Sequence, residues 1–452
     1  MKEETFSSQL IRALAIVTVF LIPITARVQM GINALYCEIA LYALVPVVLL
    51  LRGRNTPHIL LALIGLWSVI AALALGISDG RDITLASIRN ISSMILMFFV
   101  MLSPRFSTNT IYTLYRVFVI AAVASCIVGI WQTLYGYDHS VTVINLGLLP
   151  VSVGSRNLTD VLNWKLNNLH RSGLSFWQKD LAIGFFTFSN NLSEFLVYAL
   201  IALCGLRRAR RMRSTIFMSV ASLFFFAIIC SASRTGMLAA AMVIAHHFYR
   251  SANKPSYRLI ALYLIFAAVV IGVPALIYQL FSYDAFGTVS GRSDLDIGAI
   301  RVITSSVKSV LFGGNVGLYY TYFLQDPHSV IIYVWLYYGA FSAFAFTIVT
   351  LLIIRKTNYL FKTSSNREAK VICDCGLMAS LWFFLYGMTW SVIGAAQSGM
   401  MWALFAGSAL GLSRLTLKTG RQGNLAAARV PRTDNLAAAT RRWGGVITQK
   451  RV

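Results

Sequence analysis

Residues 214–250 read STIFMSVASLFFFAIICSASRTGMLAAAMVIAHHFYR: two apolar stretches, 214–231 and 235–249, joined by a short hairpin that contains Arg234. Each stretch is close to the length that an α-helix needs to cross a hydrocarbon core of about 30 Å. Cations stand at the far ends, in the arginine run at 207–213 and directly after the second stretch. The segment therefore predicts two antiparallel membrane helices whose basic ends face the same side.

The whole chain repeats this pattern. Of its 452 residues, 57% are hydrophobic and 12% are charged, and the mean hydropathy is +0.69. A soluble protein could not cover so much apolar surface with polar side chains, so lipid has to cover it. The strands of a membrane β-barrel would be short segments in which hydrophobic and polar residues alternate, whereas these stretches are long and continuously apolar. We therefore predict an all-α polytopic transmembrane bundle of about twelve helices, at residues 10–26, 35–51, 57–76, 86–103, 112–134, 181–206, 214–231, 235–249, 259–281, 329–354, 371–389 and 396–413.

Membrane topology explains the net charge of +23 without any nucleic-acid partner. With the N-terminus in the cytoplasm, most of the 39 Lys and Arg residues fall in cytoplasmic loops and in the tail. The positive-inside rule is then obeyed at every loop. One missed or invented span would reverse all later loops, so this agreement tests the span assignment. We expect a multi-pass protein with both termini in the cytoplasm.

Two connections are much longer than the others, residues 135–180 and 282–328, and both are expected outside. The second is a large external loop between the ninth and tenth helices. Within the first, residues 141–153 are apolar but too short to span comfortably, which favours an interfacial or re-entrant segment. Residues 1–413 are thus expected to form one transmembrane domain. The basic, Ala/Gly-rich residues 414–452 are expected to be a disordered cytoplasmic tail attracted to anionic lipid.

The outer loops and the outer hairpin contain several arginines and a histidine. Arg234 lies in a hairpin too short to reach far into water. Its side chain therefore either caps a helix or extends toward the membrane interface, or it binds an anion. His328 directly precedes a predicted helix and is either a polar cap or a base for proton transfer. Arginines from several loops that face one side can bind a pyrophosphate through bidentate contacts. The candidates for such a site are Arg171, Arg234, Arg292 and Arg301.

Two of the acidic residues within predicted spans lie away from a cytoplasmic helix end. Glu194 lies in the middle of one span and Glu38 near the outer end of another. A carboxylate inside the membrane is a candidate functional group, and we expect each to face an arginine such as Arg89 or Arg234. An acid that only holds helices together would give the same pattern, so both interpretations stay open.

The segments that begin at Arg171, at Ser233, at Arg301 and at His328, taken in order, resemble the bacterial O-antigen ligase and Wzy-type polysaccharide polymerase superfamily. The helix count, the orientation and the long loop before His328 fit as well, so the resemblance covers about residues 1–413. Ser329 departs from it, because many members have Asn after the His, and the basic tail departs too. The four places are Arg171-Ser-Gly with Gly184-Phe-Phe-Thr-Phe-Ser-Asn190-Asn191, Ser233-Arg234-Thr-Gly236, Arg301 with Phe312-Gly-Gly-Asn-Val-Gly317, and His328-Ser329 with Tyr338-Gly339.

The resemblance implies a metal-independent inverting glycosyltransferase of the bacterial inner membrane, without a cofactor, that takes glycan from undecaprenyl pyrophosphate at the periplasmic face. It implies that Arg171 and Arg234 hold the donor pyrophosphate and that Arg292 or Arg301 assists. It also implies that His328 activates the acceptor hydroxyl, which belongs to a growing lipid-linked chain or to a lipid A core.

The departure at Ser329 favours polymerisation of an exopolysaccharide or O-antigen over ligation in lipopolysaccharide biosynthesis. The alternative function is a transporter or flippase of lipid-linked saccharide. Transporters tend to place polar groups and broken helices near the midplane and often show repeated halves. In this chain the cations cluster in outer loops instead, which favours the transferase.

Overall fold

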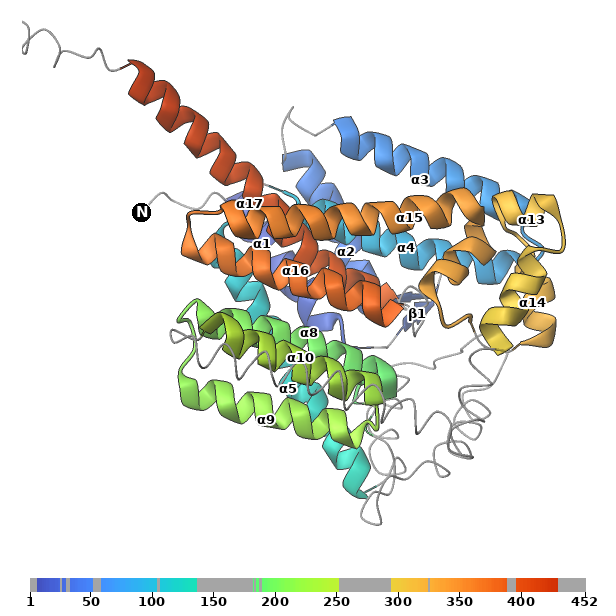
Figure 1. Cartoon of the computed structure of the whole chain (residues 1–452), viewed down its shortest axis with the longest axis horizontal. Coiled ribbons are helices and arrows are strands. Elements are labelled where there is room, and N and C mark those ends of the chain that lie inside the picture. Colours follow the sequence, from blue (N-terminus) through green and yellow to red (C-terminus); the bar gives the residue numbers. More distant parts are fainter. Residues whose placement is uncertain are drawn as a thin grey trace, which may run out of the picture.

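The computed structural model of the chain is a bundle of helices with one small two-stranded ribbon (Figure 1). It describes residues 6–24, 27–29, 33–51, 58–103, 106–135, 182, 184–186, 189–251, 294–323, 326–387 and 396–429. In chain order the elements are α1 (Phe6–Leu21), β1 (Arg27–Gln29), β2 (Asn33–Leu35), α2 (Tyr36–Leu51), α3 (His58–Ile77), α4 (Arg81–Met101), α5 (Thr108–Tyr135), α8 (Ser189–Arg208), α9 (Ser214–Cys230), α10 (Arg234–Ser251), α13 (Val307–Phe312), α14 (Val316–Tyr322), α15 (Val330–Thr363), α16 (Arg367–Gly387) and α17 (Ala396–Arg429). Residues 294–303, ahead of α13, are also helical.

Every predicted span has a helix at its place except 259–281, which lies outside the described residues. Four of these helices, α4, α5, α15 and α16, are long and apolar enough to cross a membrane. Shorter apolar segments occur in α1, α2, α3 and α9. The structure thus supports a helical membrane protein, while the number of about twelve crossings stays a prediction.

The start of α8 differs from the predicted span. The helix begins at Ser189 and not at residue 181, because residues 184–186 form a turn that packs against α5. The side-chain amide of Gln132 donates to the carbonyl of Gly184 at 3.0 Å, and its oxygen accepts the Gly184 N–H at 2.8 Å. An apolar stretch that precedes a helix was therefore mistaken for its first turns.

The last two long helices also extend beyond their predicted bounds. α15 continues to Thr363 and bends at Gly339, where the backbone leaves helical geometry. α17 continues to Arg429, so residues 414–429 are helical, although their composition predicted a disordered tail. Ala, Leu, Arg, Lys and Gln are strong helix formers, and no proline interrupts them before residue 431. The helix propensity of residues 414–429 therefore outweighs their low apolar content, which suggested disorder.

The described part of the second long connection is helical and compact. Residues 294–303, α13 and α14 follow one another and lie at one end of the bundle, beside the start of α15 (Figure 1). The connection 136–181, with the apolar patch at 141–153, and residues 282–293 lie outside the described part of the chain.

The core of the bundle is aromatic, and α8 is its central helix. Residues 191–206 of α8 are buried throughout, with α5, α9, α10 and α16 packed around them. The ring of Phe118 meets that of Phe195 edge to face at 4.8 Å, and Phe383 stacks on Trp402 at 4.4 Å. Large aromatic contacts of this type contribute beyond their buried area, so they fix the helix packing that positions both ends of the bundle.

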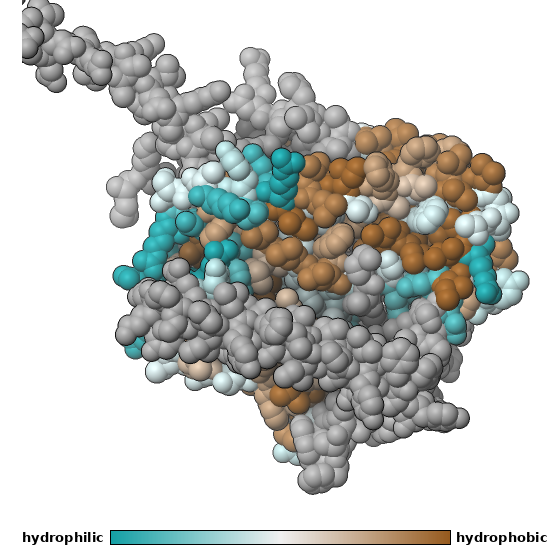
Figure 2. Space-filling model, in the orientation of Figure 1, coloured by the Kyte–Doolittle hydropathy of each residue, from teal (hydrophilic) through white to brown (hydrophobic). Residues whose placement is uncertain are grey.

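Large apolar side chains also cover the outside of the bundle. Phe341 and Phe344 on α15, Ile120 on α5 and Leu66 on α3 are exposed. Figure 2 shows hydrophobic surface over much of the visible bundle and hydrophilic residues toward its left end. Contiguous exposed apolar surface of this kind is expected where a protein faces lipid.

Alternating chain direction gives the bundle two distinct ends. α8, α10, α15 and α17 begin at the end that carries α13 and α14, which we call the loop end. The hydroxyl of Tyr386, near the end of α16, donates to the carbonyl of Asn190 at the start of α8 and confirms this alternation. The opposite end carries residues 207–213, Arg250 and Arg367, and we call it the basic end.

Candidate functional site at the loop end

A carboxylate from another helix holds the backbone at His328. Oδ1 of Asp296, in the helix 294–303, accepts the backbone N–H of His328 at 2.8 Å and that of Ser329 at 3.2 Å. Ser329 is the N-cap of α15, but its own side chain makes no capping bond. A carboxylate at this position satisfies N–H groups that the helix leaves open and interacts favourably with the helix dipole. His328 itself is buried, with 8% of its surface exposed.

A second carboxylate lies two residues before the histidine. Oδ1 of Asp326 accepts the hydroxyls of Tyr320 on α14 and of Tyr337 on α15, the latter at 3.2 Å. The two hydroxyls are also 3.2 Å from each other. The segment that contains His328 is thus held between α14, α15 and the helix 294–303.

Burial changes the acid strength of both carboxyl groups. It raises the pKa of Asp326 above the ordinary value, although the two tyrosine hydroxyls partly oppose this shift. It also raises the pKa of Asp296, while the N–H groups of Ser329 and His328 oppose the shift. Carboxyl groups with a raised pKa exchange protons closer to neutral pH than exposed ones. Both groups therefore suit a site where a proton is moved.

The glycine turn at 312–317 fits against the bend of α15. Gly313 and Gly339 both have positive φ, 71° and 82°. The N–H of Gly314 donates to the carbonyl of Leu336 at 3.1 Å. A Cβ atom on Gly339 would lie 2.0 Å from the carbonyl oxygen of Leu311, so the two backbones touch without room for a side chain. Only glycine meets both requirements at this position.

Asp79 joins the turn between α3 and α4 to the same place. Its carboxylate accepts the N–H groups of Gly317 at 2.6 Å and Leu318 at 3.1 Å, in the first turn of α14. Its own N–H donates to the carbonyl of Gly314 at 3.0 Å. We call Asp79, residues 312–317 and Gly339 together the glycine junction. It fixes three segments that are far apart in the sequence.

The predicted anion-binding arginines are described only in part. Arg171 and Arg292 lie outside the described residues. Arg234 is the first residue of α10, and its side chain lies outside the described part as well. Arg301, in the helix 294–303, is exposed, and no ion pair of its side chain occurs among the described residues.

The start of α10 packs tightly on α8. A Cβ atom on Gly236 would lie 2.7 Å from the Cβ of Ser193, which leaves no space for a larger residue. This contact fixes the start of α10 against Ser193, the residue before Glu194. Oε2 of the buried Glu194 accepts the hydroxyl of Ser398 at 2.7 Å, whereas Oε1 has no partner among the described residues. The expected pair between Glu194 and Arg234 stays a prediction.

Glu38 faces Arg89, as expected from the sequence. Nε of Arg89 lies 3.4 Å from Oε1 of the fully buried Glu38. The same oxygen accepts the hydroxyl of Ser93 at 2.8 Å, and the other oxygen accepts the N–H of Leu35 in β2 at 2.8 Å. A buried carboxylate needs such partners to offset its desolvation. These contacts tie the β-ribbon and α2 to α4, which favours a structural role for the pair.

The described residues of the places that carry the family resemblance lie at the loop end, in two groups. Gly184 and Gly236 lie around α8, while the glycine junction and His328 lie around α15. The residues that would join the two groups, Arg171 and the side chain of Arg234, lie outside the described part.

Sequence reasoning missed the roles of Asp79 and Asp296. Residues 294–296 read Asp-Leu-Asp, a spacing that also occurs in metal sites. In the structure Asp296 binds backbone N–H groups, while Asp294 is exposed. Within the described ranges, no three His, Cys, Asp or Glu side chains gather as metal ligands. An aspartate just before a glycine, as at Asp79, is a turn signal that could have been noted.

No known family model matches this chain, and no curated protein matches it either.

Proposed function

We propose that this protein is a metal-independent inverting glycosyltransferase of a bacterial inner membrane. It transfers or polymerises glycan repeat units from an undecaprenyl-pyrophosphate donor at the periplasmic face. The proposal rests on the resemblance to the O-antigen ligase and Wzy-type polymerase superfamily and on the geometry around His328.

The observation that carries the proposal is how His328 is held. The residue is buried at the loop end, Asp296 fixes its backbone, and Asp326 beside it is fixed by two tyrosines. The bonds from Asp296 cap α15 and at the same time fix the backbone of His328, and a catalytic base has to be held close to its productive geometry. The basic end lies opposite, so the positive-inside rule turns the loop end toward the periplasm.

In the proposed reaction His328 accepts the proton of the acceptor hydroxyl. The hydroxyl oxygen attacks the anomeric carbon of the donor while the bond from that carbon to the pyrophosphate oxygen breaks. The electron pair leaves with the pyrophosphate, whose added charge Arg171 and Arg234 stabilise, with Arg292 or Arg301 assisting. Preorganised groups of this kind are typically worth roughly 3 kcal/mol of the barrier.

We assign the acceptor to a growing lipid-linked chain, and hence polymerisation, on the basis of Ser329. The other acceptor that the same donor chemistry allows is a lipid A core, and the reaction is then ligation. A deletion strain distinguishes them on a glycan gel. A polymerase defect removes long chains, whereas a ligase defect leaves long chains that are not attached.

The test uses the purified protein in lipid vesicles with a lipid-linked oligosaccharide donor, and it measures the glycan length over time. We expect His328→Ala to lower the rate by about 100-fold or more, which is the usual effect of losing a general base. Arg171→Ala and Arg234→Ala should lower it as well. Lys308→Ala removes an exposed cation of the same loop region and should leave the rate unchanged.

Two outcomes would contradict the proposal. One is wild-type conversion by His328→Ala. The other is movement of the donor across the vesicle membrane without any change in glycan length, which would identify a transporter.

A further inference from the structure

The basic end contains a cavity that the proposed reaction does not use. It has a volume of about 640 Å³ and lies where the ends of α8, α9, α10, α15 and α16 meet. Its lining is rich in cations, and the basic residues at its wall are Arg207, Arg208, Arg210, Arg250, Arg367 and Lys370.

Part of this positive charge is neutralised within the protein. The buried carboxylate of Asp374 contacts Arg208, lies 3.6 Å from Arg250 and lies 3.0 Å from Nε2 of His246. Outside the cavity lining, Glu368 pairs with Arg211 at 2.7 Å. These contacts fix the ends of α8, α10 and α16 relative to one another and hold the cavity wall in place.

The other cations of the wall are not neutralised in this way. No described carboxylate pairs with Arg207, Arg210, Arg367 or Lys370. Arg207 donates to the carbonyl of Met212, and Arg367 donates to the carbonyl of Arg208. Each guanidinium retains further N–H groups, which can bind a phosphate.

A buried histidine gives an independent sign of a ligand. His247 lines the cavity and has only 5% of its surface exposed. Its ring stacks on Phe217 at 4.8 Å, yet Nδ1 has no hydrogen-bond partner among the described residues. A buried polar atom without a partner is costly, and this one lies in the wall of the basic cavity, where a small shift of the ring would let a ligand complete it.

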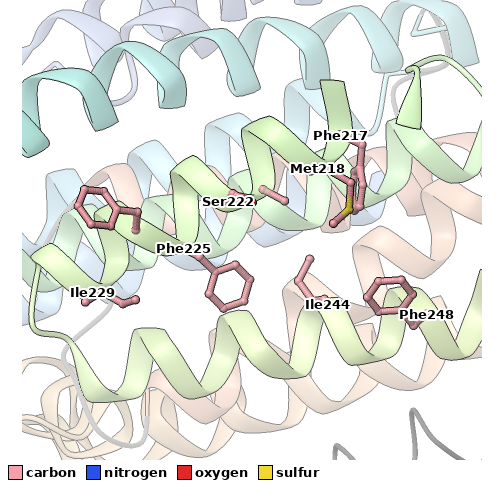
Figure 3. A pocket seen from close by; sticks show the side chains of 9 residues that line it. Phe217, Met218, Ser222, Phe225, Ile229, Ile244 and Phe248 are labelled. Carbon is pink, nitrogen blue, oxygen red and sulfur yellow. The ribbon is translucent and has the colours of Figure 1, made fainter. Parts of the chain in front are cut away.

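An apolar groove continues from the basic cavity. It lies between α9 and α10, has a volume of about 330 Å³ and shares Phe217, Met218 and Phe248 with the cavity (Figure 3). Figure 3 shows Phe225 and Ile244 pointing into the space between the two helices. Its lining from Phe217 to Ile229 runs about 18 Å along α9 at about 1.5 Å per residue. This is close to half of a hydrocarbon core of about 30 Å, or one leaflet.

We propose that the basic cavity and the groove together bind one anionic diacyl phospholipid of the cytoplasmic leaflet. Its phosphate lies among Arg207, Arg210, Arg367 and Lys370, and one acyl chain lies in the groove between α9 and α10. Basic pockets between membrane helices at the cytoplasmic side are suited to such headgroups. A zwitterionic lipid fits less well, because its ammonium group would face the same cations.

The experiment measures which lipids stay bound to the full chain, by native mass spectrometry after extraction from vesicles. The vesicles contain phosphatidylglycerol and phosphatidylcholine in equal amounts. Wild-type protein should retain phosphatidylglycerol preferentially. Arg207→Gln, Arg210→Gln and Lys370→Gln should each weaken that preference by about five-fold, and their combination by about 100-fold.

Matched variants separate a specific site from general attraction to an anionic surface. Arg213→Gln and Arg355→Gln remove exposed cations that do not line the cavity, and they should leave the preference unchanged. Ser222→Phe fills the groove and should lower phosphatidylglycerol retention, whereas Ser219→Phe on the same helix lies outside its lining and should not.

Three results would overturn the proposal. If the matched variants lose as much of the preference for phosphatidylglycerol as the cavity variants, the preference reflects only general attraction to an anionic surface. Displacement of the lipid by inorganic phosphate, with no effect of Ser222→Phe, would identify a site for free phosphate. Unchanged lipid retention in both Ser222→Phe and the combined variant would show that the retained lipid does not occupy the cavity and the groove.

Discussion

Asp296 fixes the backbone at His328 from a separate helix, and this contact determines where the candidate base lies. Its two acceptor bonds go to one oxygen, Oδ1, and an amide oxygen at that position could accept both of them. This expectation can be tested, because asparagine keeps the oxygen and alanine removes it.

We expect Asp296→Ala to destabilise the protein by about 1–3 kcal/mol, because it leaves two N–H groups at the start of α15 without their acceptor. Asp296→Asn should remain close to the wild type. Thermal unfolding in detergent measures the difference, and the glycan assay should follow the same order. Equal unfolding temperatures for the two variants would show that these hydrogen bonds do not hold the segment.

Asp326 gives a prediction about pH. Since burial raises its pKa in the folded state, its stabilising contribution is fully present below the ordinary value of 3.8 and is lost as pH rises through the raised value. Asp326→Asn keeps the acceptor oxygen for both tyrosines but does not titrate. We therefore expect the stability of Asp326→Asn relative to the wild type to increase between about pH 4 and pH 8.

Unfolding temperatures across this pH range measure that relative stability. Asp294→Asn, which changes an exposed carboxyl of the same region, is the control. A difference between Asp326→Asn and the wild type that is independent of pH would contradict the assigned pKa direction.

Arg210 occupies a backbone position where glycine is normally preferred. Its φ is 58°, and the N–H of Arg211 bonds to the carbonyl of Leu206 while that of Arg210 bonds to the carbonyl of Arg207. This is a Schellman ending of α8 with arginine in the left-handed position. Left-handed geometry costs such a residue about 1 kcal/mol, which suggests that its side chain is retained for another reason.

We expect Arg210→Gly to raise the stability of the protein by about 1 kcal/mol and, in the same protein, to weaken retention of phosphatidylglycerol. Thermal unfolding and lipid mass spectrometry measure the two effects. A gain in stability without loss of lipid would remove Arg210 from the proposed binding site.

At the scale of elements, the glycine junction explains why the chain between α13 and α14 is rich in glycine. The turn at 312–317, the bend of α15 and Asp79 meet through backbone groups, so no side chain can act as a spacer between them. Trp335 adds a bond from its indole N–H to the carbonyl of Val310 at 2.9 Å. The short helices are thereby attached to both α3 and α15.

Gly339→Ala tests this attachment. A methyl group would meet the carbonyl of Leu311 and force α15 to shift, so we expect a loss of about 3 kcal/mol or more. The control is Gly76→Ala on α3, where a Cβ meets nothing within 4 Å. It should stabilise its helix by about 1 kcal/mol. Thermal unfolding compares the two variants. Similar small changes in unfolding temperature would mean that the backbone of the glycine junction can shift to accept a methyl group.

At the scale of the whole molecule, the sequence predicted the helices well because each apolar stretch is long and bounded by charges or turns. The places of α1 to α5, α8 to α10 and α15 to α17 follow from that pattern alone. The pair of Glu38 with Arg89 could also be foreseen, since a buried acid in lipid needs a cation.

Contacts between distant segments could not be predicted in the same way. Nothing local pairs Asp296 with His328 or Asp79 with Gly317, because such contacts depend on how helices pack. The place of His247 at a helix end is typical of an interfacial residue, yet His247 is buried. The pattern of apolar residues identifies the helices, while the sites arise where their ends meet.

Cysteine labelling tests the orientation of the whole molecule. All six native cysteines are buried, so an introduced thiol should react over a low background. We expect Lys308→Cys to react with an impermeant maleimide in intact spheroplasts, because the loop end should face outward. Arg355→Cys, toward the basic end of α15, should react only after permeabilisation. The reverse pattern would invert the topology and place His328 in the cytoplasm.

The fixed bend at Gly339 divides α15 into two arms with different freedom. The arm before it is held through Leu336 and the short helices, while residues 340–363 run for about 36 Å at about 1.5 Å per residue and pack along α16. Arg355, Lys356 and Lys362 near its end can reach toward the lipid headgroups, so the arm can tilt when the thickness of the bilayer changes. Because the corner itself is rigid, such changes in membrane thickness should be absorbed by the long arm and leave the histidine undisturbed.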